Sequence, residues 1–172
     1  SSSAASDVYK RQSRILGIWD QTLETGAPDP VNGFQALYGT QYSREEIDQA
    51  LAAPDPLALV PSADENGHGT FLASVAAGGE DPDQDFTGAA PKASIAMVKL
   101  KPAKAYLRDF YLIREGADAY QENDIMMGVA YLLHLARRFS MPLVICLGLG
   151  TNQGSHVGKS PLGLYLDDIN IY

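Results

Sequence analysis

Three short apolar runs, separated by stretches of helical character, constrain the fold of this chain most. The runs cover residues 14–20, 93–100 and 141–150, and the last is almost continuously apolar until it ends in glycines. Runs of this length and composition are typical of buried strands. Helices are expected between them, at residues 43–51, 68–77 and 121–139. This order predicts an α/β fold with a doubly wound, mostly parallel sheet and helices on both faces.

Local signals mark the ends of the expected helices. Ser43 followed by Glu46 is a capping-box pattern, so a helix should begin there. The second helix should begin near His68 and end at Gly78. In the longest helix the apolar side chains that share one face are Ile125, Val129, Leu132, Leu133 and Ala136. Cys146 lies inside the third apolar run, where we expect a small buried side chain.

Composition excludes several classes of protein. The net charge of −8 argues against a nucleic-acid partner, which needs basic surface to neutralise phosphates. A single cysteine excludes an internal disulfide framework, and no apolar run approaches the ~20 residues of a membrane span. Residues 1–13 are Ser-rich at their start and are expected to be a disordered or non-native leader, followed by one domain at 14–172. The sequence leaves localisation and oligomeric state open.

His68 is flanked by Gly67 and Gly69 at the start of the second expected helix, and Asp20 ends the first expected strand. In open α/β sheets, functional groups gather at the carboxyl ends of the strands. A carboxylate that holds one imidazole nitrogen and leaves the other free forms the base and its orienting group in a nucleophilic triad. The alternative is that His68 only opens a helix in a Gly-rich turn.

Four segments, in order, resemble motifs of the subtilisin-like serine proteases: RILGIWDQT (14–22), NGHGTFLASVAAG (66–78), GAAPKASIAMVKL (88–100) and PLVICLGLGTNQGSH (142–156). The amino-acid sequences of these segments are most similar to the clostridial branch of the family, which includes spore-germination proteases. The resemblance, which covers residues 14–166, implies a subtilisin-like fold with Asp20 and His68 as catalytic residues. It implies a peptide or protein substrate bound at Gly148, Leu149 and Gly150, with residues 106–120 flanking it. It implies no required cofactor.

The chain departs from the pattern of that family at several positions. Asp20 is followed by Gln-Thr instead of Thr-Gly, Phe71 replaces a histidine, and Gly148 replaces a common serine, which should widen the pocket floor. There is no Gly-Asn pair for the oxyanion hole, and no Gly-Thr pair is followed by serine. The resemblance therefore implies the N-terminal part of a catalytic domain, incomplete at its C-terminus and inactive by itself.

The sequence contains two other candidate sites. Ser155 beside His156 could offer a hydroxyl nucleophile, but the Gly-x-Ser-x-Gly spacing of a nucleophile elbow is not present. An acidic run, formed by Glu80, Asp81, Asp83 and Asp85, could bind calcium. It lacks the spacing of an EF-hand loop, so we expect a solvated acidic loop and assign no metal ligand.

Two functions compete with a serine endopeptidase. One is a non-catalytic relative, a pseudoprotease that binds peptides or a signalling partner through the same cleft. The intact pair of Asp20 and His68 argues against it. The other is an unrelated α/β ligand-binding domain, which requires all four motif matches to be coincidental.

Overall fold

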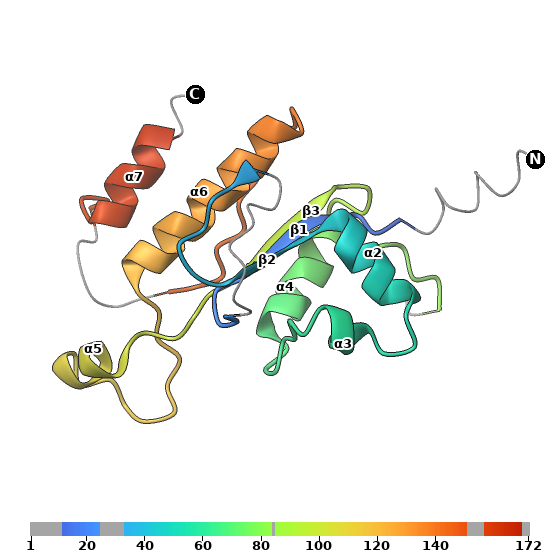
Figure 1. The fold of residues 1–172 in the computed structure, drawn as a ribbon. Coiled ribbons are helices and arrows are strands. Elements are labelled where there is room, and N and C mark those ends of the chain that lie inside the picture. The colour runs from blue at the N-terminus through green and yellow to red at the C-terminus, as the bar shows by residue number, and fades with distance from the viewer. Residues whose placement is uncertain (1–11, 25–32, 84, 151–156, 170–172) are drawn as a thin grey trace, which may run out of the picture.

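Strand β1 (Ile15–Asp20) is the centre of a three-stranded sheet, in the order β2-β1-β3. The computed structural model describes residues 12–24, 33–83, 85–150 and 157–169, so most of the expected leader at 1–13 lies outside them (Figure 1). Strand β3 (Ile95–Lys99) runs parallel to β1, and β2 (Thr40–Ser43) runs antiparallel to it. The sheet described here is therefore mixed.

The helices are α2 (Arg44–Ala52), α3 (Pro56–Leu59), α4 (His68–Ala77), α5 (Ala105–Phe110), α6 (Glu122–Arg138) and α7 (Pro161–Ile169). The three expected helices are confirmed as α2, α4 and α6, to within one residue at each end, and no bounds were predicted for α3, α5 or α7. The capping box is confirmed, because Ser43 Oγ accepts from the backbone N–H of Glu46 while the Glu46 carboxylate accepts from the N–H of Ser43. Helix α4 has the predicted bounds and ends at Gly78. No helix in the described ranges is long and apolar enough to cross a membrane.

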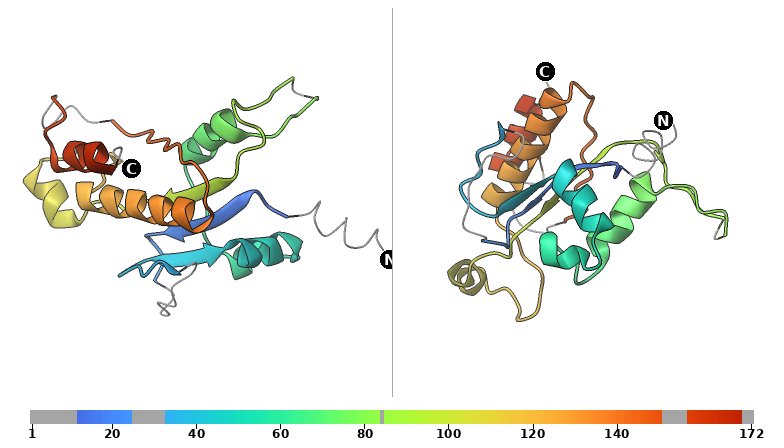
Figure 2. Two further views of the ribbon diagram at one scale, coloured as in Figure 1. Left: turned by 90° about the horizontal axis from the view of Figure 1, so that it is seen from above. Right: turned by 45° about the vertical axis from the view of Figure 1, so that its right-hand side comes forward.

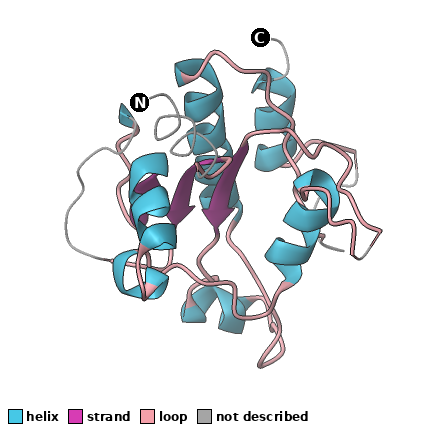
Figure 3. Ribbon diagram, turned by 90° about the vertical axis from the view of Figure 1, so that its right-hand side faces the viewer, coloured by secondary structure: helices cyan, strands magenta, loops and turns pink. Residues whose placement is uncertain are grey.

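Helices cover both faces of this small sheet (Figures 2 and 3). Neighbouring residues of a strand point to opposite faces, and Ile18 and Trp19 accordingly belong to different apolar clusters. Ile18 packs with the cluster of Tyr42 and Ile47, next to α2. Trp19 packs on the other face with buried side chains of α6, which contacts both β1 and β3. This arrangement places the carboxyl ends of β1 and β3 side by side.

The expected strand at residues 141–150 is wrong. The segment has no strand structure, the side chain of Val144 is 95% exposed, and Cys146 is exposed instead of buried. A segment becomes a strand only when its N–H and C=O groups pair with a neighbouring strand. Both edges of β1 are occupied by β2 and β3, and no hydrogen bond among the described residues joins 142–150 to β3.

Candidate active site

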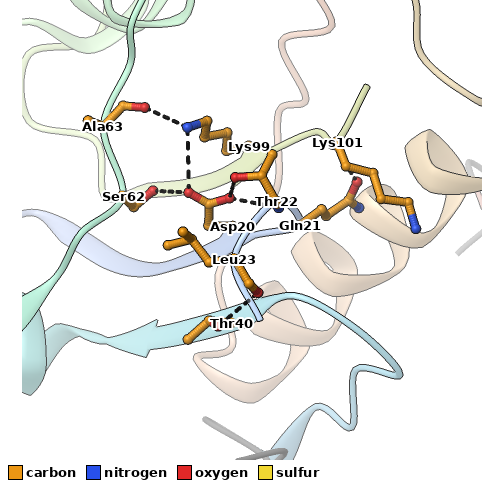
Figure 4. Close-up of polar contacts among 9 residues, drawn as sticks. All are labelled: Asp20, Gln21, Thr22, Leu23, Thr40, Ser62, Ala63, Lys99 and Lys101. Carbon is orange, nitrogen blue, oxygen red and sulfur yellow. Dashed lines mark hydrogen bonds and ion pairs between the residues drawn. The ribbon is translucent and has the colours of Figure 1, made fainter. Parts of the chain in front are cut away.

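Asp20 is the last residue of β1 and is fully buried. Its carboxylate accepts three hydrogen bonds (Figure 4). Oδ1 accepts from the backbone N–H of Thr22 at 2.8 Å and from the Thr22 hydroxyl at 2.6 Å. Oδ2 accepts from the hydroxyl of Ser62 at 2.6 Å. A buried carboxylate is costly without such partners, so these bonds allow an ionised group at the strand end.

Lys99, at the end of β3, lies opposite Asp20 in the parallel register. Its ammonium group donates to the carbonyl of Ala63 at 2.8 Å and lies 3.8 Å from Asp20 Oδ2. Ser62 and Ala63 belong to the loop that leads into α4. Two side chains thus join the end of the sheet to the loop that precedes His68: Ser62, which belongs to the loop, and Lys99, which belongs to β3.

Gln21 explains one departure from the expected motif. Its side chain is buried, donates to the backbone carbonyl of Asp124 at 3.0 Å and accepts from the N–H of Lys101 at 3.3 Å. These bonds attach the first turn of α6 to the end of β1. The Asp124 carboxylate is in turn bound by the Tyr38 hydroxyl at 2.6 Å and by the Lys101 ammonium at 3.2 Å. Burial, reinforced by the bond to Asp124, raises the pKa of the Tyr38 phenol well above its ordinary value.

Asp64 organises the start of α4, a role that the sequence interpretation missed. Gly67 adopts a left-handed conformation (φ 78°) as the N-cap, which favours glycine. Asp64 Oδ1 accepts from the N–H of Gly67, and Oδ2 accepts from both the N–H and the hydroxyl of Thr70 at 2.7 Å. Asn66 accepts from the N–H of His68 at 2.9 Å. These bonds satisfy N–H groups that a helix leaves free at its N-terminus.

We expect Asp64 to titrate far below an ordinary aspartate. The bonds from the N–H and hydroxyl of Thr70 lower its pKa from 3.8 to about 2. Because the pKa of Asp64 is lower in the folded chain than in the unfolded chain, its carboxylate stabilises the fold at pH values above 3.8, the unfolded pKa. This contribution to stability is lost as the pH falls from 3.8 through about 2. A carboxyl ¹³C NMR titration should show the low midpoint. Thr70→Val should raise it part of the way, because the N–H bond remains, and Glu65→Gln should leave it unchanged. A midpoint near 3.8 would contradict the cap.

His68 is exposed, and its ring lies against Gly148. Nε2 is 3.1 Å from the carbonyl oxygen of Gly148, and because a carbonyl can only accept, Nε2 carries the proton in this bond. No hydrogen bond between Asp20 and His68 is found in the described part of the chain, so their expected direct contact is absent from this arrangement. The structure instead connects them through the loop at residues 62–64.

The expected substrate-binding residues lie next to this histidine. Gly148 provides the carbonyl that His68 contacts, but it does not widen a pocket floor, because a Cβ there would overlap the side chain of Leu72 from α4. Leu149 is 37% exposed, and Gly150 has open space around its Cα. The expected flanking segment at 106–120 holds α5 and a loop closed by the bond from Ala103 N–H to the carbonyl of Ala119. Within the described residues no hydrogen bond joins that segment to 148–150.

Two further candidates came from the sequence, the pair Ser155 and His156 and the acidic run at residues 80–85. Ser155 and His156 lie outside the described residues. The acidic run contains a short bridge between Asp81 and Phe86, and the Asp81 carboxylate accepts from the N–H of Asp83. No cluster of three or more His, Cys, Asp or Glu side chains in the described ranges could hold a metal ion.

Comparison with known families shows which family the chain belongs to. The sequence profile of the subtilase family matches residues 16–156, a range that includes α4, β3 and all of β1 except its first residue. The chain belongs to the subtilase family. This membership confirms the resemblance and excludes an unrelated ligand-binding domain.

The structure of the CspB protease from Clostridium perfringens is similar to this subtilase, with a TM-score of 0.72 and 31% sequence identity. The match covers 94% of this chain and 29% of that one, so the chain spans less than a third of the length of this relative. A search of curated protein sequences finds no match.

Proposed function

We propose that this chain is part of the catalytic domain of a serine endopeptidase of the subtilase type. The observation that carries the proposal is the end of β1. There the carboxylate of Asp20 is buried and held by Thr22 and Ser62, and the same loop leads to His68 at the first turn of α4. Family membership supports the assignment of these two residues as orienting group and base.

In the proposed reaction, His68 takes the proton of a serine hydroxyl that attacks the peptide carbonyl, and later gives it to the leaving amine. This requires Nε2 without a proton and Nδ1 with one, whereas Nε2 now donates to Gly148. The ring must therefore leave that carbonyl and exchange tautomer. Asp20 would accept from Nδ1–H, fix this tautomer and stabilise the imidazolium that forms. The serine and an oxyanion-hole asparagine would come from a segment outside these 172 residues.

The proposal extends to peptide binding and to the sheet of the complete domain. Residues 148–150 would pair with an extended peptide as an added strand, flanked by residues 106–120. The sheet of the complete domain would be doubly wound and mostly parallel. The mechanism uses acid-base chemistry and a covalent acyl-enzyme, and it needs no cofactor.

A chimaeric protease tests the proposal. In it, this chain replaces the matched 29% of the Clostridium perfringens protease, and the remainder of that chain supplies the other elements. We expect a fluorophosphonate, which reacts with activated serines, to label the chimaera at one serine. The 172-residue chain alone should not be labelled, because none of its Gly-Thr pairs continues into serine.

The competing function is a pseudoprotease that binds peptides or a signalling partner without cleaving them. The observation in its favour is that His68 bonds to Gly148 and not to Asp20. A folded chimaera that binds peptide but is neither labelled nor active would support this function. Labelling of the chain alone, lost in a His68→Ala variant, would instead show that a serine of this chain is the nucleophile.

A further inference from the structure

Ser62 belongs to none of the motifs that point to a protease, yet its hydroxyl makes a short bond to Asp20. The distance of 2.6 Å is typical of a hydroxyl donating to an ionised carboxylate, which is among the stronger hydrogen bonds in proteins. Ser62 is half-buried and lies six residues before His68. The bond therefore fixes both the carboxylate and the loop that leads to the histidine.

Lys99 makes the second connection between the same two segments. Its ammonium donates to the carbonyl of Ala63 and lies 3.8 Å from the oxygen of Asp20 that Ser62 binds. The parallel register of β3 with β1 places Lys99 directly opposite Asp20. One cation thus holds the loop backbone on one side and faces the carboxylate on the other (Figure 4).

Among the described residues, the Asp20 carboxylate accepts fewer hydrogen bonds than it has lone pairs. An ionised carboxylate offers about four lone pairs, two on each oxygen. Thr22 uses both on Oδ1, and Ser62 uses one on Oδ2. Lys99 at 3.8 Å is beyond hydrogen-bond distance and contributes charge. In the described part of the chain, no second donor lies within hydrogen-bond distance of Oδ2.

We propose that Ser62 and Lys99 are positioning residues that hold the Asp20 carboxylate and the loop before His68 in a fixed relative position. The inference rests on the proposed function and adds to it Ser62, which lies outside the four motifs, and Lys99, which lies in the third of them. Among the described residues neither side chain forms a hydrogen bond with His68, and each acts through Asp20 and the loop backbone. A misplacement of about 1 Å in an active site can lower a rate about a hundredfold, so small tethers of this kind matter for catalysis.

The test uses two measurements on Ser62→Ala and Lys99→Met. In the 172-residue chain, both changes should shift the side-chain carboxyl ¹³C signal of Asp20 at constant pH. In the chimaeric protease, both should lower kcat by about ten- to a hundredfold and leave KM unchanged, since geometry at the reacting groups and not peptide binding is disturbed. Ser62→Thr keeps the hydroxyl and should restore both readouts.

Matched controls come from the same chain. Ser13→Ala removes a hydroxyl that accepts from Ile15 at the opposite end of β1, and Lys92→Met removes an exposed lysine just before β3. Both should leave the Asp20 signal and kcat unchanged. The inference is overturned if Ser62→Ala and Lys99→Met keep the kcat of the unmodified chimaera, or if the ¹³C signal of Asp20 does not shift. Either result leaves the proposed function unaffected. An inactive wild-type chimaera overturns the proposed function instead, and the ¹³C signal then decides whether the two tethers exist.

Discussion

Replacing His68 by alanine in the chimaeric protease is expected to lower kcat by about a millionfold. In subtilisin, a member of this family, loss of the histidine costs about this much, because the serine loses its base, while loss of the aspartate costs about 10⁴-fold. We therefore expect Asp20→Ala to be less harmful than His68→Ala. Single-turnover and steady-state kinetics with one fluorogenic peptide measure both.

His134→Ala is the matched control for that experiment. His134 is half-buried in α6, and its ring packs against Phe34 at 5.6 Å between centroids, on the face of the sheet that holds Trp19. Its loss should leave kcat unchanged. Equal losses in the His68 and His134 variants would indicate general misfolding. Retention of kcat without His68 would remove it from the mechanism.

The sequence predicted those parts of the site that depend on neighbouring residues. β1 ends at Asp20 and α4 begins at His68, as the apolar run and the glycines indicated. Both signals are local, since a strand end follows from the end of an apolar run and a helix start from residues that can satisfy its first N–H groups. Asp64, four residues before His68, was within reach of the same reasoning as a cap, but its two bonds to Thr70 were overlooked.

The contacts of Ser62 and Lys99 could not be predicted in this way. Ser62 is 42 residues from Asp20 in sequence, and Lys99 is 36 from Ala63. Only the packing of β3 beside β1 brings these groups together, and no periodic pattern encodes it. The strand expected at 141–150 failed for the same reason, because an apolar run shows that burial is favourable without showing which neighbour supplies the hydrogen bonds.

The buried face of α6 illustrates a related error. Of the five apolar residues expected to share one face, Val129 is buried and Leu132 is partly buried against the cluster of Trp19; the other buried residues of this helix are Asp124, Gly128, Tyr131 and Leu135. Gly128 lets Val98 of β3 approach, since a Cβ there would lie 3.2 Å from it. Asp124 can be buried because Tyr38 and Lys101 bind it. A pattern that counts only apolar residues overlooks glycine and paired carboxylates as members of a core.

Trp19→Ala is expected to destabilise the chain by about 3–5 kcal/mol, the range for truncating a buried large aromatic side chain. Trp19 is fully buried, and its ring lies 5.4–5.7 Å from the rings of Phe34, Tyr38 and Tyr131. Its Nε1–H also donates to the carbonyl of Tyr38 at 3.0 Å. Because domains of this kind are stable by only about 5–15 kcal/mol, a large part of the total would be lost.

Urea unfolding followed by far-UV circular dichroism measures this loss, since the variant lacks the single tryptophan that fluorescence would report. Phe110→Ala is the control, because Phe110 is 76% exposed on α5 and its truncation should change stability by less than about 0.5 kcal/mol. If Trp19→Ala does not fold, Trp19→Phe keeps an aromatic ring and should show a smaller, measurable decrease. Equal urea midpoints for Trp19→Ala and Phe110→Ala would contradict the role of Trp19 in the core that joins β1 to α6. They would also contradict the view that this core fixes the end of β1, where Asp20 lies.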